Sequence, residues 1–184
     1  ALGASEGMAH SAAGPALTAY NGPADILANL AALRFVQPGD ILVSCVDGHQ
    51  GCATVGDRIT GMAKNCGAVG FVTDGPMRDF EGVVKVGLPS WCTGLNPNSP
   101  YTKGPGTIGF GVNIGGRQVE TGDMIVADRD GVVLGIRPEE LEITQDAGAA
   151  ISGKLYALEL TGESTLVTLR NGPTSACARG HADF

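Results

Sequence analysis

The 184-residue chain has few aromatic side chains, at 5%, and few basic ones, with 12 Lys and Arg against 19 Asp and Glu. Its formal net charge is −7, and the Lys and Arg residues form no cluster. Nucleic-acid-binding proteins neutralise phosphates with clustered basic side chains, so the sequence predicts no nucleic-acid partner. The same charge balance disfavours direct binding to anionic membranes.

The sequence also lacks an apolar run long enough for a transmembrane helix. Residues 1–5 show neither the basic nor the apolar segment of a secretory signal. The five cysteines are odd in number and lack CxxC spacing. Free thiols are typical of a reducing compartment, so we expect a cytoplasmic protein.

What the chain has is glycine, at 29 residues, and an apolar content of 43%. Apolar periodicity and turn residues alternate in a strand, helix, strand, helix, strand order, which is typical of an α/β fold. The predicted elements are a strand at 14–20, a helix capped by Asp25 and ending near Phe35, a turn at 38–40, a strand at 41–46, a helix at 57–65 stopped by Gly67, and a strand at 68–72.

The second half of the chain gives weaker patterns. Residues 37–48 and 120–131 resemble each other, and each is interpreted as a turn, a strand and an acidic turn within one sheet system. The remaining expectations are a short apolar segment at 83–86, β-like alternation at 107–114, a strand at 132–136, a short helix opened by Pro138, strands or helical turns at 155–160 and 165–169, and a loop at 172–184.

The strongest candidate site follows the predicted strand at 68–72, where a Gly-Pro turn is followed by Arg78 and Asp79. Asp57 lies one helix and one strand earlier, so the three side chains meet at one edge of an α/β sheet. Arg78 offers a bidentate clamp for an oxyacid and Asp79 an oxygen ligand for Mg²⁺ or Mn²⁺. Spacing alone favours a plainer interpretation, in which Asp57 is only a helix cap and Arg78 and Asp79 form a surface ion pair.

Other patterns are weaker. Residues 104–109 match a dinucleotide-binding glycine pattern, but no helix is predicted after them. His49 near Cys45 and Cys52 has irregular spacing for zinc, and a buried thiol is favoured over a Cys52–His49 nucleophilic pair. Asp128 and Asp130 are interpreted as turn formers rather than cation ligands.

Several motifs together resemble the RraA-like family. They are Asp57 with Arg78 and Asp79, the strand end at 70–79, and the segments at 14–18, 38–40, 115–116 and 122–133. The family includes class II 4-hydroxy-4-methyl-2-oxoglutarate/4-carboxy-4-hydroxy-2-oxoadipate aldolases and regulators that inhibit an endoribonuclease. The resemblance covers roughly residues 1–142.

The resemblance implies a swivelling β/β/α fold in one domain, with residues 143–184 as a C-terminal extension packed on it. It also implies a homotrimer, or a hexamer made of two trimers, with sites between neighbouring subunits. The tail after Leu141 lacks the charged, helical character of the family, so it assigns no carboxylate from a neighbouring subunit.

The resemblance further implies residue roles. Asp79 would bind Mg²⁺ or Mn²⁺, Arg78 would contact the pyruvyl oxygens, and Asp57 would orient a metal-bound water. The backbone of Gly56, Arg58 and Ile59 would receive the pyruvate carboxylate.

These roles make a metal-dependent pyruvate aldolase the leading hypothesis, with a 4-hydroxy-2-oxo diacid as substrate and oxaloacetate decarboxylation as a second activity. A non-catalytic protein that binds and inhibits an endoribonuclease is the alternative, and an enzyme acting on an unrelated oxyacid is a third.

Overall fold

The computed structural model describes residues 11–136, 154–161, 164–171 and 174–181. The chain divides into two compact units, Ala1–Gly135 and Ile136–Phe184. The predicted boundary at residue 142 lies outside the described residues. Packing of the C-terminal segment on the first unit stays a prediction.

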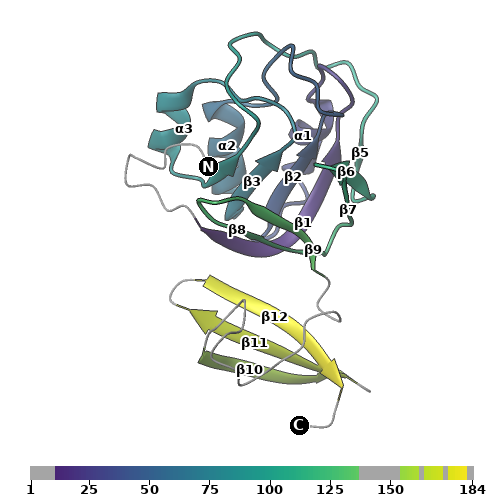
Figure 1. Ribbon diagram of the computed structural model, residues 1–184, viewed down its shortest axis with the longest axis vertical. Helices are drawn as coiled ribbons and strands as arrows, with labels where there is room; N and C mark the ends of the chain where they lie inside the picture. The colour runs from purple at the N-terminus through teal and green to yellow at the C-terminus, as the bar shows by residue number, and fades with distance from the viewer. Residues whose placement is uncertain (1–10, 137–153, 162–163, 172–173, 182–184) are drawn as a thin grey trace. The chain divides into compact units, whose positions relative to one another are not determined.

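The first unit contains a seven-stranded sheet, shown in Figure 1. Its strands are β1 (Ala12–Tyr20), β2 (Ile41–Cys45), β3 (Gly70–Thr73), β4 (Ser90–Trp91), β5 (Thr107–Ile108), β8 (Met124–Ala127) and β9 (Val132–Ile136). The order is β4-β3-β2-β1-β8-β9, and β5 pairs with β1 beside this path. β1 to β4 run parallel, whereas β8 is antiparallel to β1. The predicted α/β class is confirmed.

Side chains of the parallel strands alternate between two buried cores, because successive residues of a strand face opposite sides of the sheet. Leu42 and Phe71 face a core that includes residues of the helices, while Val43 and Val72 face the other core. All four are at most 3% exposed. Strands buried on both faces have continuous apolar sequences, which is the pattern at 68–72.

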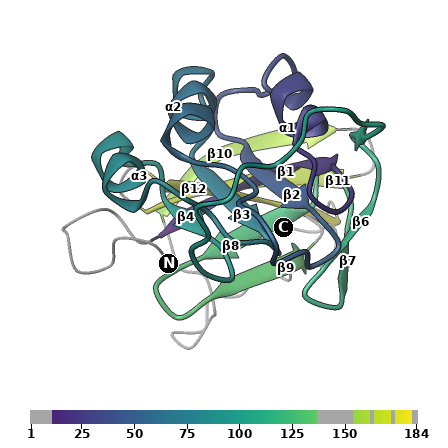
Figure 2. The same ribbon diagram turned by 90° about the horizontal axis from the view of Figure 1, so that it is seen from above.

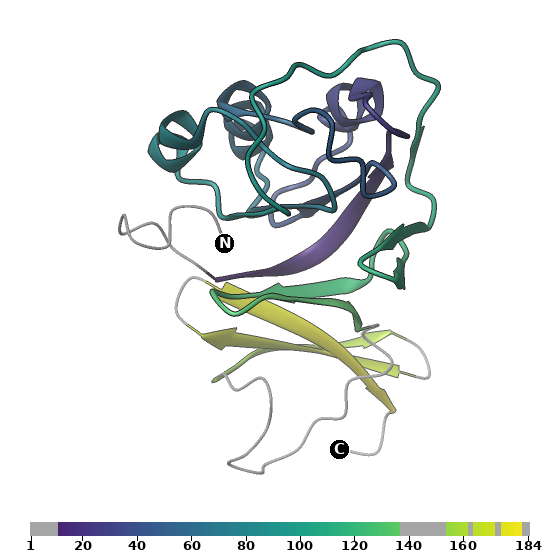
Figure 3. The same ribbon diagram turned by 45° about the horizontal axis from the view of Figure 1, so that its top comes forward.

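Three helices cover one face of the parallel strands and lie in a row, as Figure 2 and Figure 3 show. They are α1 (Leu27–Ala32), α2 (Asp57–Asn65) and α3 (Phe80–Val86), and each connects consecutive parallel strands. The apolar segment at 83–86 is thus the end of a helix. No helix among the described residues is long and apolar enough to cross a bilayer.

The opposite face packs against β8 and against a hairpin formed by β6 (Val112–Ile114) and β7 (Arg117–Val119). Trp91 belongs to this core, and its indole Nε1 donates to the carbonyl of Asp128 at 2.7 Å. The predicted β-like alternation at 107–114 corresponds to β5 and β6.

The helix predicted from Asp25 to Phe35 is shorter than expected. It ends at Ala32, because Arg34 and Phe35 donate to the carbonyls three residues before them and close a tighter turn. The cap residue is Ile26 and not the predicted Asp25, although Oδ1 of Asp25 accepts from the amide of Leu27, the first residue of the helix, at 2.8 Å.

β1 also begins earlier than the predicted residue 14, because Ala12 to Pro15 pair with β8. β2 and β8 are the two strands predicted from the similar segments at 37–48 and 120–131. They flank β1 on its two sides, so the interpretation of two similar strand starts in one sheet is confirmed.

The second unit contains three antiparallel strands, β10 (Lys154–Thr161), β11 (Ser164–Asn171) and β12 (Thr174–His181). The prediction of a loop at 172–184 is wrong, because β12 pairs with β11 over its full length. The small and polar residues of this segment show no apolar alternation, so the sequence did not indicate a strand. They can still pair, because the hydrogen bonds of a β-ladder come from the backbone and not from the side chains. The helix predicted at Pro138 lies outside the described residues.

Candidate active site

The candidate site lies where the carboxyl ends of β2, β3 and β4 meet. In parallel sheets these ends and the helix starts that follow them form the usual ligand crevice. The loops concerned are residues 46–56, 74–79 and 92–106. They converge because their strands are neighbours in the sheet.

The backbone of Met77 fixes the turn that carries Arg78 and Asp79. Met77 is fully buried, donates to the carbonyl of Gly94 at 2.9 Å and accepts from the amide of Asn96 at 2.9 Å. The amide of Arg78 donates to the carbonyl of Val55 at 3.1 Å. The turn is thus held between two loops, and the position of Arg78 is set by hydrogen bonds.

Asp79 has a left-handed backbone conformation, with φ 56° and ψ 47°. Asp and Asn adopt this region more readily than most residues, but it is still uncommon, and such residues cluster at functional sites. Its carbonyl accepts from the amide of Val83 at 2.8 Å, which begins α3. Its carboxylate makes no capping hydrogen bond to this helix and is 45% exposed.

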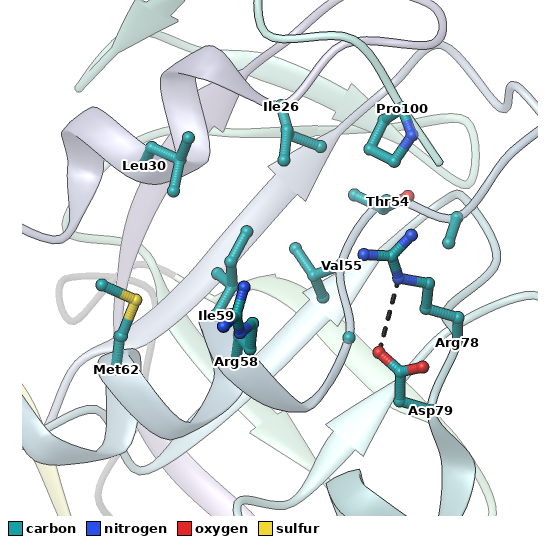
Figure 4. Close-up of a pocket in the computed structure, with 12 residues that line it drawn as sticks. Ile26, Leu30, Thr54, Val55, Arg58, Ile59, Met62, Arg78, Asp79 and Pro100 are labelled. Atoms are coloured by element: carbon teal, nitrogen blue, oxygen red, sulfur yellow. Dashed lines mark ion pairs between the residues drawn. The ribbon is translucent and has the colours of Figure 1, made fainter. Parts of the chain in front are cut away.

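Arg78 and Asp79 line a pocket of about 570 Å³, shown in Figure 4. The predicted residues Gly56, Arg58 and Ile59 line the same pocket. Nε of Arg78 lies 3.4 Å from Oδ2 of Asp79, and the Arg78 side chain is 34% exposed. The structure therefore brings five of the six predicted site residues to one cavity.

Position 56 requires glycine because there is no room for a side chain. Its φ of −138° is available to any residue, but a Cβ there would overlap the Asp79 carboxylate and lie 3.0 Å from Cγ of Arg78. The backbone at the start of α2 can therefore approach the Arg78–Asp79 pair closely. A larger residue would displace the carboxylate from the pocket wall.

Asp57 is the sixth predicted residue, and it is not among the pocket-lining residues. Its carboxylate lies against α3, since a Cβ on Gly82 would be 2.6 Å from Oδ2 of Asp57. Asp57 is the first residue of α2, and Gly56 is the N-cap. Its role in orienting water stays a prediction.

The first backbone N–H groups of α2 lie beside Gly56, on the same side of the fold. The first N–H groups of a helix have no intrahelical acceptor, and the helix dipole favours an anion beside them. Residues Gly56 to Ile59 therefore offer donors at the pocket wall, next to the Arg78 guanidinium. This arrangement suits a small carboxylate.

A hydrated divalent cation fits the donor chemistry at Asp79. Within the part of the chain that the structure describes, no three His, Cys, Asp or Glu side chains are grouped to share a metal ion. This excludes a closed all-protein cage of described residues, such as structural zinc requires. Mg²⁺ binds through one or two carboxylates and keeps several waters, which a half-exposed Asp79 permits.

Cys45 is the last residue of β2, and His49 and Cys52 lie in the loop that follows it. Burial raises the pKa of Cys45 to about 11, and burial also raises the pKa of Cys52. A thiol with a raised pKa is a poor nucleophile at neutral pH. His49 and Cys52 line a small gap whose lining does not include Arg78.

Two weaker motifs are also explained by the structure. Residues 104–109 contain β5 and no helix follows them, so they do not form the dinucleotide-binding arrangement. Oδ1 of Asp128 accepts from the amides of Asp130 and Gly131 at 2.8 and 3.1 Å. Asp128 is thus a turn former, as predicted.

The sequence did not indicate several residues at this site. Oγ of Ser99 accepts from Nη1 of Arg78 at 2.7 Å. Apolar side chains of α1, α2 and the 92–106 loop complete the wall: Ile26, Leu30, Met62 and Pro100. The apolar period of the two helices was visible in the sequence, but which side chains border the pocket depends on how the helices pack.

Solved structures share this fold. The RNA-processing inhibitor RraA from Thermus thermophilus superposes with a TM-score of 0.67 over 72% of this chain and 80% of that chain, at 24% identity. An RraA protein of Streptomyces coelicolor, described as an unusual member of the RNase ES inhibitor family, has a TM-score of 0.59 at 34% identity. The two chains are covered to 71% and 69%.

Curated relatives carry a different provisional name, 4-hydroxy-4-methyl-2-oxoglutarate aldolase. One from Halalkalibacterium halodurans is 36% identical over 134 residues, which are 73% of this chain and 64% of the relative. One from Halorhodospira halophila is 31% identical over 54% of this chain and 62% of the relative. The chain thus spans about three fifths of the length of these relatives.

A family model described as RraA-like, Aldolase/RraA, matches residues 2–134. The match includes every strand and helix that borders the pocket, and it agrees with the fold of the solved neighbours. The chain belongs to the RraA-like family.

Proposed function

We propose that this protein is a divalent-metal-dependent pyruvate aldolase. It cleaves a 4-hydroxy-2-oxo diacid to pyruvate and a second oxoacid, and it also decarboxylates oxaloacetate. The names of the curated relatives support aldolase chemistry. The observation that carries the proposal is that Arg78, Asp79 and the start of α2 line one pocket together.

The pocket accounts for binding of the pyruvyl half of the substrate. The carboxylate binds the amides at the start of α2, from Gly56 to Ile59. The Arg78 guanidinium binds the keto acid oxygens from the adjacent wall, and its planar fork suits a carboxylate. Gly56 allows both groups to contact one small ligand, because it leaves room beside the Asp79 carboxylate.

Asp79 is the residue that would hold Mg²⁺ or Mn²⁺, with waters as the other ligands. When bound, the cation supplies Lewis-acid stabilisation of the negative charge that develops on the keto oxygen. Arg78 adds a fixed positive charge beside the same oxygen. Electrostatic stabilisation of this kind is usually the largest contribution to catalysis.

Both reactions break one carbon–carbon bond and leave the enolate of pyruvate. In the aldol cleavage, the C4 hydroxyl loses its proton, the C3–C4 bond breaks, and its electron pair passes to the enolate. In the decarboxylation, CO₂ leaves instead. A proton then returns to C3. We assign proton transfer to Asp57 acting through an intervening water.

The direct test is pyruvate release from oxaloacetate and from 4-hydroxy-4-methyl-2-oxoglutarate, with EDTA and then with added Mg²⁺ or Mn²⁺. We expect EDTA to abolish release and either cation to restore it. Arg78→Ala is expected to lose release at every metal concentration. Full release by the EDTA-treated protein would refute the metal site, and no release from either substrate would refute the reaction.

A second candidate function is inhibition of an endoribonuclease by direct binding. The observation that favours it is the 34% identity to the Streptomyces coelicolor protein of the RNase ES inhibitor family. Co-purification with an RNase E-type enzyme, followed by an RNA cleavage assay, tests it. Binding that persists in Arg78→Ala would separate this function from catalysis.

We also propose that the protein forms a trimer or a hexamer with a site between neighbouring subunits. The support is the open wall beside Arg78 and Asp79, which are 34% and 45% exposed in the single chain. Light scattering coupled to size exclusion distinguishes a trimer and a hexamer from a monomer. A monomer with full activity would refute the shared site.

A further inference from the structure

The segment at residues 96–104, here called the strap, borders the pocket and has no assigned role. It contains Ser99, which contacts Arg78, and Pro100, which lines the pocket. It has neither helix nor strand of its own. Its course is set by hydrogen bonds at its two ends and by two at Tyr101, whose amide donates to the carbonyl of Ala24 at 2.7 Å and whose carbonyl accepts from the amide of Ile26 at 3.0 Å.

The first end of the strap is tied to the loop after β2. Nδ2 of Asn96 donates to the carbonyl of Gln50 at 2.8 Å, and Nδ2 of Asn98 donates to the carbonyl of Gly51 at 3.1 Å. The carbonyl of Asn98 accepts from the amide of Ala53 at 3.0 Å. These bonds fix the strap just before Ser99.

The second end is tied to the buried carboxylate of Asp25, which is 8% exposed. Its Oδ2 accepts from the amides of Lys103 and Gly104 at 2.7 and 3.0 Å. Burial by itself raises the pKa of Asp25, but the backbone hydrogen bonds together lower it below its usual value. An ionised acceptor makes stronger hydrogen bonds than a neutral one.

Ser99 lies between these two ends. Its Oγ is 2.7 Å from Nη1 of Arg78, a different guanidinium nitrogen from the Nε that faces Asp79. A long Arg side chain loses considerable rotamer entropy when it is held in one geometry. Two contacts at separate nitrogens hold it better than one.

We propose that Ser99 is a positioning residue that orients the Arg78 guanidinium in the pocket, and that Asp25 holds the strap that presents Ser99. The orientation of Arg78 by Ser99 does not depend on the proposed function. Only the effect on oxoacid binding by Arg78 rests on it. If the Asp79 carboxylate bound a cation, Oγ of Ser99 would still hold Nη1 of Arg78, so the guanidinium would stay aligned. Prealignment of a binding group lowers the entropy lost on binding.

Three variants test the role of Ser99 in pyruvate release. Ser99→Ala removes the hydroxyl, Ser99→Thr keeps it, and Thr102→Ala changes an exposed hydroxyl residue of the same strap. Loss of one hydrogen bond to a charged group predicts a roughly tenfold fall in kcat/KM for Ser99→Ala. Ser99→Thr is expected to restore most of this fall, and Thr102→Ala to resemble the wild type. Equal kcat/KM in Ser99→Ala and Thr102→Ala would overturn the proposal.

A second readout needs no catalysis and therefore separates this inference from the proposed function. The Nε–H signal of Arg78 in ¹H–¹⁵N spectra, assigned by its loss in Arg78→Lys, reports motion of the guanidinium. We expect a sharp, slowly exchanging signal in the wild type and in Ser99→Thr, and a weakened one in Ser99→Ala. An unchanged signal in Ser99→Ala would overturn the contact even if the enzyme is active.

Hydrogen exchange tests the role of Asp25 in the wild-type protein, before any variant is needed. The amides of Lys103 and Gly104 are expected to exchange more slowly than that of Thr102. In Asp25→Asn, which keeps the shape but not the charge, their exchange should accelerate and the Arg78 signal should weaken. Equal exchange of the three amides in the wild type would overturn the role of Asp25.

Discussion

Two aspartates of one turn after β3 show opposite environments. At the base of the turn, Asp74 accepts from the amides of Val46 and Gly48, each at 2.8 Å. At its tip, Asp79 makes an ion pair with Arg78 at 3.4 Å and is 45% exposed. The first carboxylate is occupied by the fold, whereas the second remains available to a ligand.

The difference separates structural from functional acidic residues. Asp74 ties the loop after β2 to the end of β3, and that loop continues to Gly56 and the start of α2. Asp79 instead has a left-handed backbone that the surrounding hydrogen bonds impose. A carboxylate with satisfied acceptors stabilises the fold, and one with free acceptors can bind a cation.

The largest expected effect is on catalysis at the tip of the turn. Asp79→Ala removes the proposed metal ligand, and stabilisation by a cation is worth several kcal/mol, so kcat/KM should fall on the order of a thousandfold. The free energy of unfolding should fall by only about 1 kcal/mol, because the carboxylate is half exposed but alanine adopts the left-handed backbone of Asp79 less readily than aspartate. Pyruvate release and calorimetry measure the two effects, and a variant that keeps wild-type release contradicts the distinction between Asp74 and Asp79.

A smaller loss is expected when the space beside Asp79 is filled. Gly56→Ala places a methyl group against the carboxylate, and misplacement of a reacting group by about 1 Å costs roughly a hundredfold in rate. Gly61→Ala is the matched control in the same helix, because its Cβ would lie 3.6 Å from Val86. The control should keep its activity and gain about 0.5–1 kcal/mol in stability.

At the base of the turn the expected effect is on stability. Asp74→Ala leaves the amides of Val46 and Gly48 without their acceptor, so the free energy of unfolding should fall by about 2 kcal/mol. Pyruvate release should persist at temperatures where the variant is folded. Asp130→Ala, at an exposed turn, should change stability by less than about 0.5 kcal/mol in the same urea titration.

The smallest effect concerns the thiol beside Asp74. Burial raises the pKa of Cys45 from 9.0 to about 11. The unfolded thiol therefore loses its proton at a lower pH than the folded one, and stability present below pH 9 is lost as pH rises toward 11. Urea unfolding near pH 8 and near pH 10 should show a smaller fall in Cys45→Ala than in the wild type. An identical fall would show that another group titrates.

The sequence was sufficient to predict the turn at Arg78 and Asp79, because an apolar run followed by Gly-Pro marks the end of a buried strand. It was not sufficient to predict Ser99, since the 96–104 segment has no periodicity and part of its course depends on the buried carboxylate of Asp25, 78 residues before Lys103 in the chain. The early end of α1 was missed for a different reason, because the turn after Ala32 is closed by local hydrogen bonds of Arg34 and Phe35 that the apolar spacing does not reveal. Local patterns predict elements, whereas contacts between distant segments decide which side chains share a pocket.

β1 joins the two halves of the main sheet, since it pairs with β2 on one side and with β8 on the other. Its partner strand β2 follows soon after it in the chain. Ala12, however, pairs with Ala127, which is synthesised much later. During synthesis on the ribosome, the helices and parallel strands can therefore assemble while the first residues of β1 still lack a neighbour. We expect this exposed strand edge to be where a nascent chain of the protein meets chaperones, until β8 emerges and completes the sheet.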